Sequence, residues 1–344
     1  MKILFDARWI NNDSPDGITR YSRELIKELS KTSDDITLLI SSKDQLTNLP
    51  ELDYIVTNAP THYTEIGQAS RLNSHGFDIV YTPHFLFGGK GRNFKLLRTV
   101  LDLIPFHHKN KQSSLVWKIF HSNMFFLKKL ISDSDGLVTI SETVQKQLQK
   151  YTQHQIVVIH CAPTAFKASR VKTAKELLYI GRYEPYKNVE TLVRAIKYLP
   201  GYTLLLAGNC PDERRKALTE LVANKDQVKF LGVISDVNYQ DKLNSAFAAV
   251  SASKDEGFGL QLIEAMQVGC PVICSDIEIF KEIVGDSGYY FQPTNPEEMA
   301  QRVRELATGG NWQKLSKSSI QVAQKYNWQT SARKFNDFCK DILG

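Results

Sequence analysis

The sequence lacks the features that mark membrane-spanning, exported or disulfide-bonded proteins. No run approaches the roughly 18 consecutive apolar residues that a membrane-spanning helix needs. Asp6 interrupts the start of the chain, where a secretory signal needs its apolar stretch. The five cysteines are odd in number and scattered, and they form neither a disulfide framework nor a paired CxxC motif. We therefore expect a cytoplasmic protein with reduced thiols, in which Cys270 and Cys274 are small core residues.

Signatures of several ligand classes are missing as well. No cluster of His, Asp and Glu has the spacing of a divalent metal site. No GxGxxG motif follows the first expected strand, which argues against a dehydrogenase. The net charge of +6 is not accompanied by a known nucleic-acid-binding module. We therefore expect no metal and no nucleic-acid partner.

The composition is that of a globular protein. Apolar residues make up 42% and charged residues 23% of the chain, close to the average for folded domains. At 344 residues, the chain exceeds the size at which a single hydrophobic core usually stops growing, so we expect two domains.

Apolar runs of strand length alternate with segments of helical period, which predicts parallel sheets covered by helices. The expected strands of the first half are Lys2–Ala7, Ile36–Ile40, Ile55–Thr57, Asp78–Tyr81, Leu97–Val100 and Gly136–Ile140. Those of the second half are Leu177–Ile180, Thr203–Ala207, Val228–Leu231, Ala249–Ala252 and Pro271–Ser275.

The same rhythm in both halves predicts an α/β protein with two doubly wound, Rossmann-like domains facing a central cleft. We place the first domain at residues 1–165, the second at 166–325, and a last helix that crosses back to the first domain at 326–344. Ligands of such sheets bind at the carboxyl ends of the strands, so functional residues are expected just after them.

The most informative segment is 251–266, where an expected strand ends at a glycine-containing turn that opens a helix. Backbone N–H groups near Phe258, Gly259 and Leu260 would point out of the helix start and bind an anion or a hydroxyl group. Because Gly257 and Gly259 lack a Cβ, a ligand could approach the main chain closely.

Two carboxylates, Glu256 and Glu264, flank this turn. If the chain between them were all helix, they would lie about 12 Å apart along the helix axis, a span that fits opposite ends of a diphosphate-linked ligand. One would then hold sugar hydroxyls and the other a ribose. The alternative is that both are ordinary acids at a helix start, favoured by the helix dipole.

A second segment, 179–188, places two cations after a strand. The side chains of Arg182 and Lys187 can reach a phosphate from that position. Taken singly, each would be an ordinary surface cation.

Together, these segments resemble the retaining glycosyltransferases of family 4, which adopt the two-domain GT-B fold. The resemblance lies in the E-x7-E spacing of Glu256 and Glu264 within the run E-G-F-G-L-x-x-x-E-A-M. It continues into residues 269–275, which have the form G-x-P-V-I-x-S, and covers most of 176–307.

The resemblance implies metal-independent, retaining transfer of a hexose-type sugar from a UDP- or GDP-linked donor, with no further cofactor. The candidate catalytic residues are Arg182, Lys187, Glu256 and Asp102. Arg182, Lys187 and Glu256 are also expected to bind the donor. The other residues expected to bind it are Gly17, Gly208, Ile234, Gly257, Phe258, Gly259, Leu260 and Glu264.

The match is weaker in the first half of the chain. Gly17 resembles the glycine loop at the family's first helix, but Asp16 replaces a second glycine, so a simple turn is the alternative. Asp102 is expected to orient hydroxyl groups or, alternatively, to cap a turn. It follows Leu101, which stands where many relatives carry a histidine. Nearby histidines that could supply an imidazole are His84, His107 and His108.

Residues 90–129 carry nine Lys or Arg against one acid. This charge indicates either a solvated face or a surface for an anionic partner, such as lipid headgroups or a pyrophosphate-linked acceptor. Within this stretch, 114–131 would be a helix that rests on the inner face of an anionic membrane, or a core-packing helix whose lysines reach solvent.

We therefore predict a glycosyltransferase that moves a sugar to a glycan or lipid-pyrophosphate-linked acceptor. The resemblance to the family places this reaction in surface polysaccharide biosynthesis. One alternative is a sugar-nucleotide epimerase, because some isomerases share this double architecture. The other is a non-catalytic nucleotide-sugar binding partner, which the missing histidine at Leu101 suggests.

Overall fold

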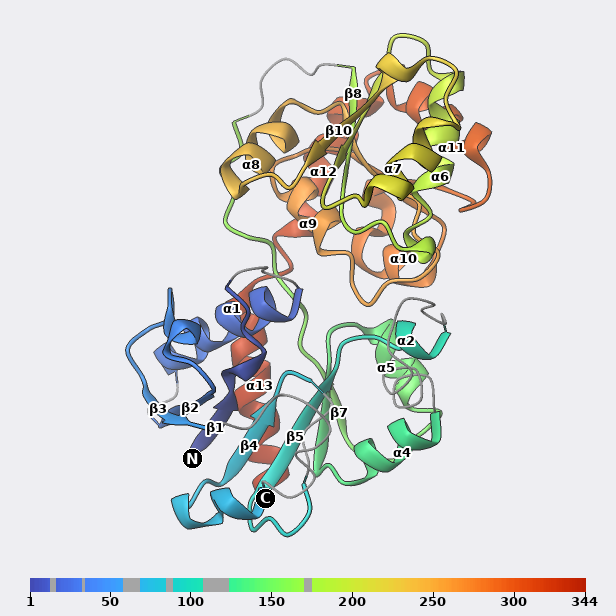
Figure 1. The fold of residues 1–344 in the computed structure, drawn as a ribbon. Helices are drawn as coiled ribbons and strands as arrows, with labels where there is room; N and C mark the ends of the chain where they lie inside the picture. The colour runs from blue at the N-terminus through green and yellow to red at the C-terminus, as the bar shows by residue number, and fades with distance from the viewer. Residues whose placement is uncertain (13–16, 33–34, 58–68, 85–88, 108–123, 170–174) are drawn as a thin grey trace. The chain divides into compact units, whose positions relative to one another are not determined.

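The structure is a computed structural model that describes residues 1–12, 17–32, 35–57, 69–84, 89–107, 124–169 and 175–344. The chain divides into two compact units (Figure 1). Unit 1 comprises Met1–Cys161 together with Asn327–Gly344, and unit 2 comprises Ala162–Tyr326. The sequence analysis placed these divisions after residues 165 and 325.

Unit 1 is built on a sheet with seven strands in the described part of the chain, all parallel, in the order β3-β2-β1-β4-β5-β6-β7. Several strands are buried along their whole length, as expected for a parallel sheet covered on both faces. The strands are β1 (Ile3–Asp6), β2 (Ile36–Ile40), β3 (Asp53–Val56), β4 (Ile79–Thr82), β5 (Lys95–Val100), β6 (Gly136–Thr139) and β7 (Ile156–Val158).

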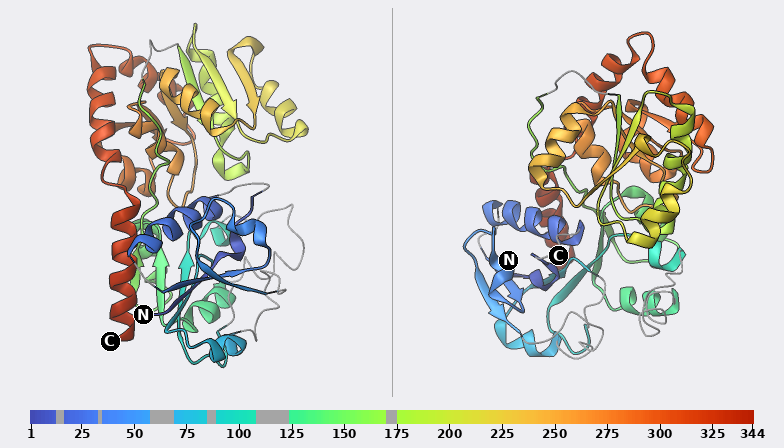
Figure 2. Two further views of the ribbon diagram at one scale, coloured as in Figure 1. Left: turned by 90° about the vertical axis from the view of Figure 1, so that its left-hand side faces the viewer. Right: turned by 45° about the horizontal axis from the view of Figure 1, so that its top comes forward.

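In unit 1, a helix near the start of the chain, α1, contacts the last helix, α13. α1 and α13 pack against each other, with the ring of Tyr21 edge-on to Trp328, and α13 is the long red helix of Figure 2. The helical elements are η1 (Ala7–Trp9), α1 (Gly17–Thr32), η2 (Lys43–Leu46), η4 (Ala69–His75), α2 (Ile104–His107), α4 (Met124–Ser132), α5 (Glu142–Leu148) and α13 (Trp328–Leu343).

Unit 2 is built on a second parallel sheet, which has six strands in the order β10-β9-β8-β11-β12-β13 among the residues described. The order reverses between β8 and β11, so the loops after these two neighbouring strands emerge at the switch point of the sheet. The strands are β8 (Glu176–Ile180), β9 (Thr203–Ala207), β10 (Val228–Gly232), β11 (Ala248–Ser251), β12 (Val272–Ser275) and β13 (Gly288–Phe291).

Two groups of helices cover the sheet of unit 2. α6 packs with α7 and α11, and α9 packs with α10 and α12 (Figure 1). The helical elements are η5 (Pro185–Lys187), α6 (Val189–Ala195), η6 (Ile196–Tyr198), α7 (Asp212–Thr219), η7 (Lys225–Gln227), α8 (Asp236–Ser245), α9 (Leu260–Gln267), α10 (Glu278–Val284), η8 (Gly285–Ser287), α11 (Pro296–Leu306) and α12 (Asn311–Ala323).

The predicted α/β class with two doubly wound sheets is confirmed. One strand in each sheet was not expected from the sequence: β7 and β13, both of which lie at a sheet edge. The prediction that Cys270 and Cys274 are core residues is confirmed, because both are fully buried. Of the predicted helix at 114–131, residues 114–123 lie outside the described part of the chain. Among the described helices, none combines the length and the apolar character needed to cross a bilayer.

Candidate active site

The loop after β8 carries the two predicted cations and ends in a left-handed residue. Pro185 begins the short helix η5, and Asn188 ends it with a φ of 51°. Few residues other than glycine adopt this conformation, and asparagine is among the most tolerant of it. The turn therefore fixes Lys187 just before α6 begins.

Asn188 also clamps this loop to the ends of two other strands. Its buried Nδ2 donates to the carbonyl oxygens of Ala252, at 3.0 Å, and Pro293, at 2.6 Å. Its Oδ1 accepts from the hydroxyl of Thr191, which also donates to Pro293. The position of Lys187 is thus tied to the segments that follow β11 and β13. No role was expected for Asn188 from the sequence. A polar residue directly before a helix was a signal for a cap, but the Asn188 side chain does not cap α6.

Lys187 and Glu256 form an ion pair where the loops after β8 and β11 meet. Lys187 Nζ lies 2.6 Å from Glu256 Oε1, and the two side chains are only 12% and 8% exposed. The same oxygen accepts from the hydroxyl of the fully buried Ser253, at 2.8 Å. Breaking a pair shielded in this way leaves an uncompensated charge with little water to solvate it. The structure therefore brings together two of the predicted catalytic residues, with Ser253 as a partner that the sequence analysis missed.

The predicted glycine turn precedes α9, and the helix starts with neither a capping side chain nor an acid in its first turn. Gly259 has a φ of 97°, and a Cβ at this position would come within 2.8 Å of the Phe280 ring. The interpretation that Gly259 leaves room for a ligand therefore needs correction, because the missing Cβ makes room for α10. Gly257 and Phe258 are buried, and the ring of Phe258 packs edge-on against Tyr326.

Glu264 lies on the buried side of α9. Its Oε1 accepts from the hydroxyl of Thr164, at 3.1 Å, and the residue is 2% exposed. Glu256 precedes the helix, which begins only at Leu260, so the two carboxylates do not share the continuous helix assumed in the 12 Å expectation. The alternative that both are helix-start acids is also wrong, since neither lies in the first turn of α9.

Arg182 projects from the loop after β8 and contacts Tyr186. Its side chain is 72% exposed, its Nη2 donates to the Tyr186 hydroxyl at 2.7 Å, and its Nε lies 3.5 Å from Glu184. The ammonium of Lys187 lies over the ring of Tyr186, 5.2 Å from its centre. Tyr186 therefore contacts both predicted cations, a role that the sequence analysis missed.

The loop after β9 brings a glycine into close contact with the loop after β8. A Cβ on Gly208 would lie 2.1 Å from the carbonyl oxygen of Gly181. The N–H of Gly208 donates to the carbonyl oxygen of Gly232 at 2.8 Å. Backbone crowding therefore accounts for the glycine at 208. Ile234 is half-buried beyond β10, next to the highly exposed Val233.

The two predicted site residues of unit 1 lie at the carboxyl side of its sheet. Gly17 is the exposed first residue of α1, and a Cβ there would meet nothing within 4 Å. Asp102 follows β5 and accepts from the N–H of Ile104 at 3.0 Å, so the turn-capping alternative is present in the structure. His84 stacks on Trp9 with a ring-centre distance of 4.1 Å. His107 is exposed at the end of α2, and His108 lies outside the described residues.

The sequence matches a known family over the region that contains these loops. The family model described as glycosyl transferases group 1 matches residues 163–335. The chain belongs to this family.

Two bacterial relatives align with this glycosyltransferase over most of its length. The O-antigen chain mannosyltransferase RfbU of Salmonella typhimurium is 26% identical, over 84% of this chain and 87% of the relative. The O-antigen chain mannosyltransferase B of Escherichia coli is 29% identical, over 96% of this chain and 97% of the relative.

Solved structures share the fold along the whole chain. Sucrose-phosphate synthase from Thermosynechococcus elongatus superposes with a TM-score of 0.76 at 20% identity, and 99% of each chain is covered. HepE of Anabaena, solved with UDP and glucose, gives a TM-score of 0.75 at 16% identity, over 98% of this chain and 99% of that one. These similarities show the GT-B fold of two Rossmann-like units.

The loops of unit 2 offer this glycosyltransferase fixed positive charge beside a helix start. An exposed guanidinium and a shielded ammonium share one loop, and the start of α9 carries no acidic residue. Such an arrangement suits an anionic group that approaches the carboxyl ends of the strands. No group of three or more His, Cys, Asp and Glu suitable for a metal ion occurs in the described part of the chain.

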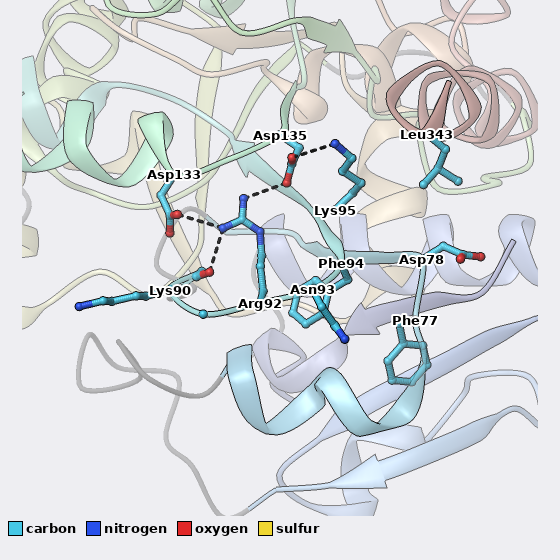
Figure 3. A pocket seen from close by; sticks show the side chains of 12 residues that line it. Phe77, Asp78, Lys90, Arg92, Asn93, Phe94, Lys95, Asp133, Asp135 and Leu343 are labelled. Carbon is cyan, nitrogen blue, oxygen red and sulfur yellow. Dashed lines mark hydrogen bonds and ion pairs between the residues drawn. The ribbon is translucent and has the colours of Figure 1, made fainter.

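Unit 1 has a cavity of about 710 Å³ beside the amino ends of β5 and β6, on the side of the sheet away from Gly17 and Asp102 (Figure 3). Three of its side chains form an ion network: Arg92 reaches Asp133 at 2.9 Å and Asp135 at 2.8 Å. Beneath them, Arg98 is buried against Ser134 and Asp133, and burial lowers the pKa of Arg98 to about 10. The network joins the segments that precede β5 and β6, at the amino ends of the strands, whereas ligands of parallel sheets bind at the carboxyl ends.

Replacing Lys187 should destabilise unit 2. In Lys187→Met, the Glu256 carboxylate loses its counter-ion in a shielded position, so the free energy of unfolding should fall by about 3 kcal/mol. Urea unfolding measures the change. The double variant Lys187→Met/Glu256→Gln should recover most of the loss, because no lone charge remains; equal stability of the single variant and the wild type would contradict the argument.

The Arg92 network should make stability depend on pH. Partial burial alone would raise the pKa of Asp135, but hydrogen bonds from Arg92 and the N–H of Leu96 lower it below its ordinary value of 3.8. A carboxyl group whose pKa is lower in the folded state contributes its full stabilisation at pH values above its unfolded-state pKa. This contribution is lost as the pH falls through the folded-state pKa. In urea unfolding, the stability of the wild type should therefore fall more steeply than that of Asp135→Asn from about pH 5 to pH 3. Parallel pH profiles would refute this assignment.

Proposed function

We propose that this glycosyltransferase transfers a hexose, with retention of configuration, from a nucleotide diphosphate sugar to a glycan or lipid-linked acceptor in the assembly of a surface polysaccharide. The observation that carries the proposal is the contact of 2.6 Å between Lys187 and Glu256, made between the two loops at the switch point of unit 2. The named O-antigen mannosyltransferases support the polysaccharide setting.

The two cations act on the diphosphate of the donor. Negative charge grows on the β-phosphate as it leaves the sugar, and Arg182 and Lys187 meet that charge from fixed positions. Because the positions are set before reaction, little reorganisation is needed as the charge develops. Transfer then proceeds without a metal, and the departing phosphate takes the proton of the attacking hydroxyl on the same face of the sugar.

The acids and the glycine turn hold the rest of the donor. Glu256 orients Lys187 and, with its second oxygen, binds a sugar hydroxyl, while the backbone at the start of α9 faces the anionic group. Glu264 holds the ribose, and the loops at Gly208 and Ile234 lie along the nucleoside. Unit 1 presents the acceptor, with Asp102 orienting hydroxyl groups.

Nucleotide diphosphate sugars should stabilise the protein by binding its folded state. Since both named relatives are mannosyltransferases, GDP-mannose is the first compound to test, beside UDP-glucose. At 100 times its dissociation constant, the true donor should contribute about 2.7 kcal/mol and raise the Tm by about 5 °C in a thermal-shift measurement. Arg182→Ala should retain the Tm of the free protein, because its side chain is exposed, but should show a much smaller shift at the same donor concentration. A series of donors that leaves the wild-type Tm unchanged would count against the proposal.

Product analysis separates transfer from isomerisation and from simple binding. In the presence of an acceptor, the donor that gives the thermal shift should release its nucleoside diphosphate, and NMR of the new linkage should show the anomeric configuration of the donor. Arg182→Ala should slow the release by roughly 100-fold or more, the usual effect of removing one preorganised transition-state contact. Conversion of the nucleotide sugar without release would identify an epimerase, and an inverted linkage would remove the retaining mechanism.

A further inference from the structure

One aromatic side chain joins the two cations of the loop after β8. The hydroxyl of Tyr186 accepts from Arg182 at 2.7 Å, and its ring lies under the ammonium of Lys187 at 5.2 Å from the ring centre. The hydroxyl contact is made at the edge of the ring and the ammonium contact over the ring. A single rigid group therefore contacts both cations, from two directions.

Tyr186 is itself held firmly. The residue is 8% exposed, and its carbonyl oxygen accepts from the N–H of Lys254 at 2.8 Å, which ties it to the loop that carries Glu256. Asn188, two residues further on, anchors the same loop to Ala252 and Pro293. The ring thus has a fixed place at the point where the two loops meet.

We infer that Tyr186 is a positioning residue that holds Arg182 for the donor diphosphate, at a set distance from Lys187. This inference rests on the proposed function. An exposed arginine samples many rotamers and loses that freedom when it binds a phosphate. The hydrogen bond to Tyr186 restricts the side chain beforehand, so less freedom remains to be lost on binding.

The neighbouring Tyr183 provides a matched control. It belongs to the same loop and is buried, but its hydroxyl has no hydrogen-bond partner among the residues that the structure describes. Removing that hydroxyl takes away the same atom as in Tyr186→Phe without touching either cation. A difference between the two variants therefore reports the contact with Arg182 and not the loss of a buried hydroxyl in general.

The test is a calorimetric titration of the full chain with GDP and with UDP. Tyr186→Phe should bind the preferred nucleotide up to about tenfold more weakly, because binding must then order the long side chain of Arg182. Tyr183→Phe should bind as the wild type does. Urea unfolding of both variants checks that the fold is retained.

A double-mutant cycle separates positioning of Arg182 from a general structural role. In the Arg182→Ala background, Tyr186→Phe should change the affinity by less than about twofold, because the contact between the two side chains is already removed. A structural role would weaken binding equally in both backgrounds. Equal effects in the two backgrounds, or wild-type affinity in Tyr186→Phe, would therefore overturn the inference.

The same titration distinguishes failure of this inference from failure of the proposed function. If the wild type binds GDP or UDP and Tyr186→Phe binds it equally well, the inference alone is lost. If the wild type binds neither nucleotide, the proposed function is lost, and this inference is lost with it.

Discussion

The ion pair between Lys187 and Glu256 is the interaction on which the candidate site depends. Removing two charges from water is costly, and their attraction offsets that cost only when the geometry is good and each charge keeps further partners. The surrounding residues provide both conditions. Ser253 donates to the carboxylate, the ring of Tyr186 lies under the ammonium, and Asn188 fixes the backbone between the cation and α6.

The sheet of unit 2 explains why these residues meet. β8 and β11 are neighbours, although more than sixty residues separate them in the sequence, and the winding order reverses between them. Each strand ends in a loop at the same edge, so one loop brings the cations and the other brings Glu256 and the start of α9. The position of the charges is set mainly by two rigid strands, and side-chain contacts then refine it.

Much of this arrangement could be predicted from the sequence, because strand runs, glycine turns and charged residues after strands are visible as patterns. Lys187 and Glu256 were both expected at one site, and the structure pairs them. The contacts made by Tyr186 and Asn188 could not be predicted, because they depend on where a ring and an amide point across loops that are distant in sequence. Gly259 is a second example. The sequence pattern indicated a backbone conformation that needs glycine, but only the structure shows that α10 fills the space where a Cβ would lie.

The edge strands were missed for other reasons. β13 begins with a glycine directly after η8 and so lacks the apolar run of a central strand. β7 is a run of three apolar residues, none of them fully buried, which was overlooked in the sequence. Asp102 remained ambiguous because one residue type both caps turns and binds hydroxyl groups, and the bond to Ile104 shows the first use without deciding on the second.

The arrangement of the units along the chain affects the order in which they can fold during translation. Unit 1 contains both the first residues and the last helix, α13, whose Phe335 packs edge-on against Tyr81 of the central strand β4. Unit 2 is an uninterrupted segment, Ala162–Tyr326. During translation, unit 2 can therefore fold as soon as its own residues have emerged from the ribosome, whereas unit 1, although begun first, must wait for α13 to close its core.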